Sequence, residues 1–79
     1  MNKSAKSEIN HINPAKLLLS KWTSLAPINK EKHFLVTQVE KNEQNVAISC
    51  TLEAILTHQE YSISWQELKD KSRWLVGWL

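Results

Sequence analysis

The sequence predicts a small, mainly β domain (α+β at most), either an SH3/Tudor-like barrel or a curled antiparallel meander of four to five strands with a short N-terminal helix. Three observations predict this fold class. "VAISCTLEAIL" (46–56) alternates with period two, as a strand with one buried face does. "HFLVTQVE" (33–40) is rich in β-branched and aromatic residues, and "EYSISW" (60–65) alternates again. Three consecutive strands of this kind predict a meander.

The N-terminal 13 residues contain few apolar side chains and many Asn, Ser and Lys residues, so we expect a flexible basic arm over 1–13 and one small β-rich domain over 14–79. Residues 1–33 carry a net charge of +4 and the remainder −2. Asn13 as N-cap and Pro14 at the first helical position predict a helix of one or two turns. A β-branched Thr23 and then Pro27 limit its length.

Two segments complete the expected domain. Ser64 and Glu67 stand at capping-box spacing in "SWQELKD" (64–70) and predict a single helical turn. "RWLVGWL" (73–79) is short and aromatic, and Gly77 disfavours a helix interior, so it is interpreted as a closing strand. This segment and residues 21–25 are the candidates to add strands to the meander. Strand order stays open at this stage.

The expected core comprises Val36, Ile48, Cys50, Leu52 and Ile63. Cys50 is the single cysteine and cannot form an intramolecular disulfide, which fits a reducing, cytoplasmic location. Its place on the alternating apolar face predicts a buried, inert thiol of raised pKa. The longest apolar runs are too short for a signal peptide or a membrane span, so no membrane association is expected.

The sequence does not favour an enzyme, a metal site or a cofactor. His11, His33 and His58 have no His or Cys at zinc-ligand spacing. Glu67 and Asp70 are explained by capping and solvation of a helical turn. The chain has one glycine and therefore no glycine-rich phosphate loop.

Aromatic residues combined with lysines indicate a non-catalytic binding module. Single-stranded RNA or DNA could stack its bases on an exposed indole beside lysines that meet phosphates. The candidate contact residues are Trp22, Phe34, Tyr61 and Trp65, and the candidate phosphate contacts are Lys21, Lys30 and Lys32. Burial of both Trp22 and Trp65 would remove this shared platform. The alternative is a protein partner, or self-association, through an exposed sheet edge with tryptophan anchors.

Five stretches carry a resemblance to a known family. They are "SKWT" (20–23), "NKEKHFLVT" (29–37), "LEAIL" (52–56), "YSISWQELKD" (61–70) and "WLVGW" (74–78). In this order and spacing, from about Asn13 to the end, the chain resembles a family of small bacterial tryptophan-rich proteins of unknown function. The resemblance implies no activity and transfers no catalytic residue.

Overall fold

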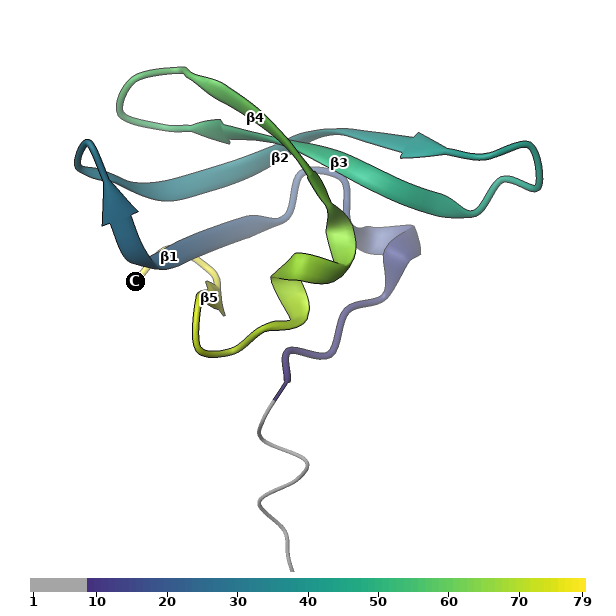
Figure 1. Ribbon diagram of the computed structural model, residues 1–79, viewed down its shortest axis with the longest axis horizontal. Helices are drawn as coiled ribbons and strands as arrows, with labels where there is room; N and C mark the ends of the chain where they lie inside the picture. The colour runs from purple at the N-terminus through teal and green to yellow at the C-terminus, as the bar shows by residue number, and fades with distance from the viewer. Residues whose placement is uncertain (1–8) are drawn as a thin grey trace, which may run out of the picture.

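The computed structural model describes residues 9–79, which form one antiparallel sheet and two short 3-10 helices (Figure 1). In chain order the elements are η2 (Pro14–Lys16), β1 (Lys21–Ile28), β2 (Glu31–Lys41), β3 (Ala47–Ala54), β4 (Glu60–Ser64), η3 (Trp65–Lys69) and β5 (Trp74–Val76). The strands lie in the order β4-β3-β2-β1-β5, and every neighbouring pair is antiparallel.

The sheet is curled and open, which confirms the mainly β fold class and selects the meander over the barrel. β2, β3 and β4 pair consecutively, as the alternating sequence predicted. In Figure 1, β1 and β5 lie beneath the layer formed by β2, β3 and β4, with η3 across the open side. Within residues 9–79 no pairing joins β4 to β5, so the SH3/Tudor-like barrel is not closed and both strands remain edges.

The core fills the inside of the curl. Its buried apolar residues are Leu17, Trp22, Phe34, Val36, Cys50, Leu52, Ala54, Trp65, Leu68 and Trp74. Val36, Cys50 and Leu52 are therefore core residues, as expected. Burial raises the pKa of the Cys50 thiol to about 11, with smaller contributions from the Glu40 and Glu67 carboxylates. This raised pKa is the one that the apolar pattern around Cys50 predicted.

Two residues expected in the core are less buried than predicted, and one of them, Ile63, still packs against the core. Ile48 is 51% exposed, because the register steps from Glu40↔Ser49 to Lys41↔Ala47 and leaves Ile48 as the extra residue of a bulge. Figure 1 shows this end of the β2–β3 hairpin extending beyond the rest of the domain. Ile63 is only partly buried, since it lies on the edge strand β4 with a neighbour on one side alone.

Both short helices form where the sequence predicted them. The Asn13 side chain accepts a hydrogen bond of 3.0 Å from the Ala15 N–H, and Pro14 occupies the first helical position of η2. η3 follows Ser64, but Ser64 makes no side-chain cap, so the predicted capping box is wrong. η3 is instead fixed by burial of Trp65 and Leu68 in the core.

The C-terminal segment pairs with the sheet, as predicted. β5 aligns Trp22 with Val76 and Ser24 with Trp74. The chain then crosses the other face of β1, where the Thr23 hydroxyl donates to the Gly77 carbonyl at 2.6 Å and accepts from the Leu79 N–H at 3.0 Å.

Part of the expected N-terminal arm packs against the domain. Residues 1–8 lie outside the described part of the chain. Ile9 forms a β-bridge with Asp70, and Asn10 is buried with its backbone N–H bonded to the Lys69 carbonyl at 2.9 Å. Ile12 packs against the core. The packed domain therefore begins before Pro14.

Candidate functional site

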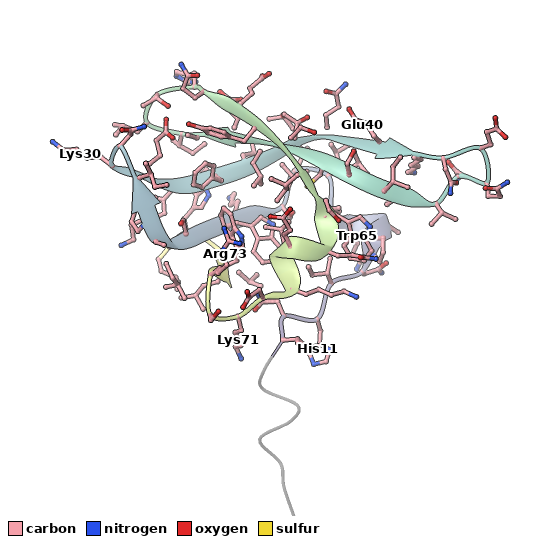
Figure 2. All side chains as sticks on the ribbon, in the orientation of Figure 1. His11, Lys30, Glu40, Trp65, Lys71 and Arg73 are labelled. Carbon is pink, nitrogen blue, oxygen red and sulfur yellow. The ribbon has the colours of Figure 1, made fainter. Side chains whose placement is uncertain are left out.

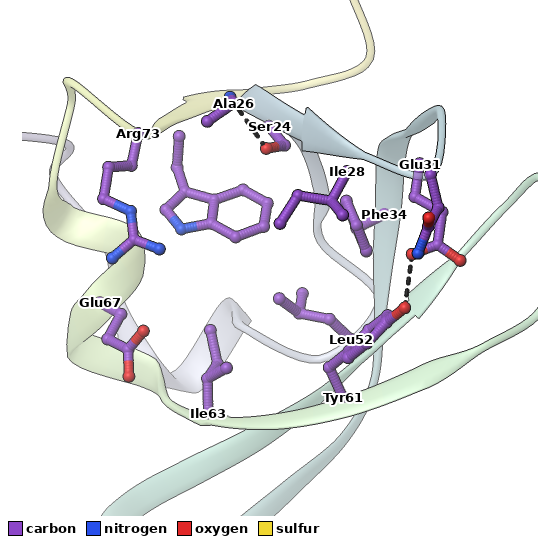
Figure 3. A pocket seen from close by; sticks show the side chains of 12 residues that line it. Ser24, Ala26, Ile28, Glu31, Phe34, Leu52, Tyr61, Ile63, Glu67 and Arg73 are labelled. Carbon is purple, nitrogen blue, oxygen red and sulfur yellow. Dashed lines mark hydrogen bonds between the residues drawn. The ribbon is translucent and has the colours of Figure 1, made fainter.

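A pocket of about 320 Å³ lies on the inside of the curl, between β1 and β4 (Figure 3). Its lining comprises Ser24, Ala26, Ile28, Asn29, Glu31, Phe34, Leu52, Tyr61, Ile63, Glu67, Arg73 and Trp74. We call this the β1–β4 pocket. Its volume lies at the lower end of the range of small-ligand sites, about 300–1,000 Å³, and suits one large side chain or a small molecule.

The pocket exists because β1 leaves β2. The register changes from Thr23↔His33 to Ile28↔Glu31, so β1 carries extra residues in this stretch and bends away from its partner. Pro27 falls in the bend, where its missing N–H breaks no ladder bond. The chain returns through a tight turn in which Asn29 and Lys30 both have positive φ, at 58° and 65°. The bend makes one wall of the pocket, and β4 makes the opposite wall.

Three aromatic rings line the pocket. The Phe34 and Tyr61 centroids are 6.2 Å apart with planes at 68°, and the Phe34 and Trp74 centroids are 5.4 Å apart with planes at 79°. Both pairs have the edge-to-face geometry that aromatic rings favour. The three rings therefore meet at steep angles instead of stacking.

A carboxylate occupies one end of the pocket. Glu31 is 5% exposed and accepts hydrogen bonds from the hydroxyls of Thr57 and Tyr61. Figure 3 shows the Tyr61 bond as a dashed line. The Thr57 bond, followed by the Tyr61 bond, lowers the pKa of Glu31, so this side chain is an anion at neutral pH. The same bond to Glu31 raises the pKa of the Tyr61 phenol.

The other end of the pocket holds Arg73 and Glu67, which Figure 3 shows across the pocket from Glu31 and Tyr61. Trp74 lies next to Arg73 in the chain, and its Nε1 is buried without a hydrogen-bond partner among the described residues. The other three indoles each donate a bond: Trp22 to Ser20, Trp65 to Ala47 and Trp78 to Phe34. The indole that lines the pocket is therefore the one with a free donor.

The predicted aromatic platform does not form. Trp22 and Trp65 are 3% and 8% exposed, and both indoles belong to the core. Phe34 is also buried, whereas Tyr61 is 40% exposed. Trp22 and Trp65 thus present no free ring face on which a base could stack.

The predicted lysines are exposed but are not gathered at the pocket. Lys21 lies over the exposed Trp78 ring, with Nζ 4.9 Å from the centroid. The His33 ring is 6.2 Å from Trp78. Lys30 lies at the tip of the β1–β2 hairpin (Figure 2), and Lys32 is exposed on β2. None of the three lines the pocket.

Sequence reasoning found Phe34 and Tyr61 but missed Glu31, Arg73 and Trp74 as pocket residues. One signal for Glu31 was present, because a two-residue polar turn at Asn29–Lys30 places it first in the next strand. No pattern in the sequence indicated that Arg73 would face Glu31 across a cavity, since pairing of β5 with β1 brings it there.

In residues 9–79 no three His, Cys, Asp or Glu side chains form a group that could hold a metal ion. No helix in that part of the chain is long and apolar enough to cross a membrane.

The comparisons with known proteins identify a family. No curated protein and no solved structure matches the chain. Residues 20–79 match the family described as "Tryptophan-rich protein (DUF2389)", which has no known function. This match runs through all five strands and agrees with the resemblance of the tryptophan-containing segments. Since it spans more than half of the chain, the protein belongs to the DUF2389 family of tryptophan-rich proteins.

Proposed function

We propose that this protein is a non-catalytic binding module that holds an extended segment of a partner protein along the edge of β4, with one side chain in the β1–β4 pocket. The observation that carries the proposal is the position of the pocket, which opens beside a strand edge that no other strand of the described chain covers. Addition of a peptide strand to such an edge is a common mode of recognition.

The backbone of β4 supplies the hydrogen-bonding groups that this mode needs. The Ala54 N–H bonds to the Gln59 carbonyl, which sets the alternation of the β3–β4 ladder. Tyr61 and Ile63 therefore bond to β3, and the N–H and C=O groups of Glu60 and Ser62 point away from it. An incoming strand would find donors and acceptors at these two positions.

The pocket supplies selectivity for a side chain. Tyr61 and Ile63 line it from β4, and Ala26 and Ile28 line it from β1. Together with the Trp74 ring, these side chains give the pocket an apolar surface that favours the apolar part of a bound side chain.

Single-stranded RNA or DNA is less well supported as the partner. Trp22 and Trp65 are buried. The exposed indole of Trp78 is covered by Lys21 on one side and neighboured by His33. A base would compete with Lys21 for the ring face that this lysine covers. Lys30 and Lys32 are exposed and available for phosphates, so a titration with single-stranded DNA should be followed at these two residues.

A peptide titration tests the proposal. The probes are acetylated, amidated pentapeptides of the form Ser-Thr-Xaa-Thr-Ser, because β4 has five residues, with Xaa drawn from every side-chain class. We expect saturable NMR shifts at the amides of Ser62 and Ala26 for at least one peptide. Ser62→Pro, which removes an outward N–H, should weaken that binding by about tenfold or more, whereas Ser62→Ala should keep it within about twofold.

Any one of four outcomes would overturn the proposal. The first is the absence of a saturable shift with every peptide, and the second is equal binding to wild-type protein and Ser62→Pro. The third is saturable, salt-sensitive binding of a mixed-sequence single-stranded DNA oligonucleotide that maps to Lys30 and Lys32, which would assign the nucleic-acid function instead. Concentration-dependent dimerisation abolished by Ser62→Pro would instead assign the edge to a second copy of the chain.

A further inference from the structure

We propose that the group bound in the β1–β4 pocket is a positively charged alkylammonium, held by the Glu31 carboxylate and the rings of Phe34, Tyr61 and Trp74. If the ammonium is the side chain of a bound segment, such as a lysine or a methylated lysine, the inference rests on the proposed function. Binding of a free ammonium depends on the pocket residues alone.

Among the described residues, the Glu31 anion has no counter-charge beside it. No Lys, Arg or His nitrogen of residues 9–79 lies within 4.0 Å of its carboxylate, since the one contact of that kind joins His58 and Glu53. Its two hydrogen bonds come from uncharged hydroxyls. A carboxylate that is shielded from solvent is normally paired with a cation, because its charge loses part of its hydration. Each carboxylate oxygen still has room to accept another bond.

The ring geometry favours the same charge. The face of an aromatic ring carries partial negative charge and attracts a cation within about 6 Å of the centroid. Phe34 lies at steep angles to both Tyr61 and Trp74, so the rings form the sides of a corner. Tyr61 joins this corner to Glu31 through its hydroxyl. Full negative charge and aromatic rings thus line the same pocket, a combination that favours quaternary ammonium groups.

The remaining lining groups fix where the cation would lie. Arg73 is the one cationic side chain of the lining and lies at the far end with Glu67 (Figure 3). Repulsion by Arg73 therefore directs a bound ammonium toward Glu31. Leu52 and Ile63 add apolar lining that suits methyl or methylene groups.

Two probes of the same shape, one charged and one neutral, test whether binding in the pocket depends on positive charge. Choline carries a quaternary ammonium, and 3,3-dimethyl-1-butanol has a carbon in place of the nitrogen. Each is titrated into the full chain while the Trp74 indole N–H and Tyr61 ring signals are followed by NMR. We expect choline to bind about tenfold more tightly than the neutral alcohol.

Matched variants assign the preference to the site. Glu31→Gln should reduce the choline preference to less than about twofold, whereas Glu60→Gln removes the same charge from an exposed position outside the lining and should leave it unchanged. Tyr61→Phe keeps a ring and should retain the preference, and Tyr61→Leu should lose most of it. Far-UV circular dichroism establishes that each variant is folded.

Equal binding of both probes, or saturable binding of neither, would overturn the inference. So would equal loss of choline binding in Glu31→Gln and Glu60→Gln, since that pattern reports net charge only. None of these results affects the proposed function, which is decided separately by the peptide titration and by Ser62→Pro. If the pocket prefers peptides in which Xaa is uncharged, the addition of a peptide strand to β4 would stand, and the binding of an ammonium would be refuted.

Discussion

Asn10 ties the N-terminal segment to the far end of the chain, and its replacement by alanine should be strongly destabilising. Its Nδ2 donates to the carbonyls of Leu68 at 2.8 Å and Trp74 at 2.9 Å, and the residue is 6% exposed. Asn10→Ala removes both donors and leaves two carbonyls without these partners. Each lost bond costs about 0.5–1.5 kcal/mol, with a further penalty for each buried carbonyl, so we expect a total of about 2–4 kcal/mol.

This loss is a large fraction of the total free energy of unfolding. A domain of 79 residues has a free energy of unfolding of about 4–12 kcal/mol at the usual stability per residue. Urea unfolding followed by tryptophan fluorescence and far-UV circular dichroism gives the difference between variant and wild type. Asn13→Ala is the matched control, because Asn13 is exposed and caps η2 through one bond, with an expected cost of about 0.5–1 kcal/mol.

The asparagine variants should differ clearly in their free energy of unfolding. Asn10→Ala should be much less stable than Asn13→Ala. Asn10→Asp should be no more stable than Asn10→Ala at neutral pH, because an ionised carboxylate cannot donate to two carbonyls. If Asn10→Ala and Asn13→Ala were equally stable, within about 0.5 kcal/mol of wild type, the two bonds to Leu68 and Trp74 would contribute nothing. The segment before Pro14 would then not belong to the cooperative unit.

Two other residues give sharp predictions. Burial raises the pKa of Cys50 from 9.0 to about 11, so its contribution to stability is complete below pH 9 and is lost as the pH rises through 11. Between about pH 8 and about pH 10.5, urea unfolding of wild type should lose about 1–2 kcal/mol more than Cys50→Ala, after allowance for solvent screening, and parallel profiles would refute this. Thr23→Val keeps the shape of the side chain but removes its bonds to Gly77 and Leu79, and should cost about 1–3 kcal/mol. Amide exchange at Gly77 should accelerate, and unchanged exchange there would show that Thr23 does not hold the segment.

The arrangement of polar groups explains how a small sheet keeps buried polar side chains. Thr23 is buried because the C-terminal segment crosses it, and its hydroxyl both donates and accepts there. Asn10 is similarly satisfied by two carbonyls. Glu31 differs, since its partners are hydroxyls and its charge is unbalanced within the described residues. That difference distinguishes a structural polar contact from a candidate binding group.

The sequence alone determined the local structure. Alternation at Cys50, Leu52 and Ala54 predicted the buried face of β3, because side chains on a strand point to opposite faces with period two. Asn13 and Pro14 predicted the start of η2, since both act through bonds between near neighbours. The apolar "RWLVGWL" predicted that the C-terminal segment joins the sheet, and β5 pairs with β1.

Only the tertiary structure decided which aromatic rings reach a ligand. Period two gives the face of the sheet on which Trp22 lies but not what covers that face, and the packing of the curl buries it. The β1–β4 pocket needs three long-range events: β1 bends from β2, β4 remains an edge, and β5 brings Trp74 beside Ser24. Each depends on contacts between residues distant in the chain. Local patterns do not encode these contacts, because they record a residue's neighbours in sequence and not its neighbours in space.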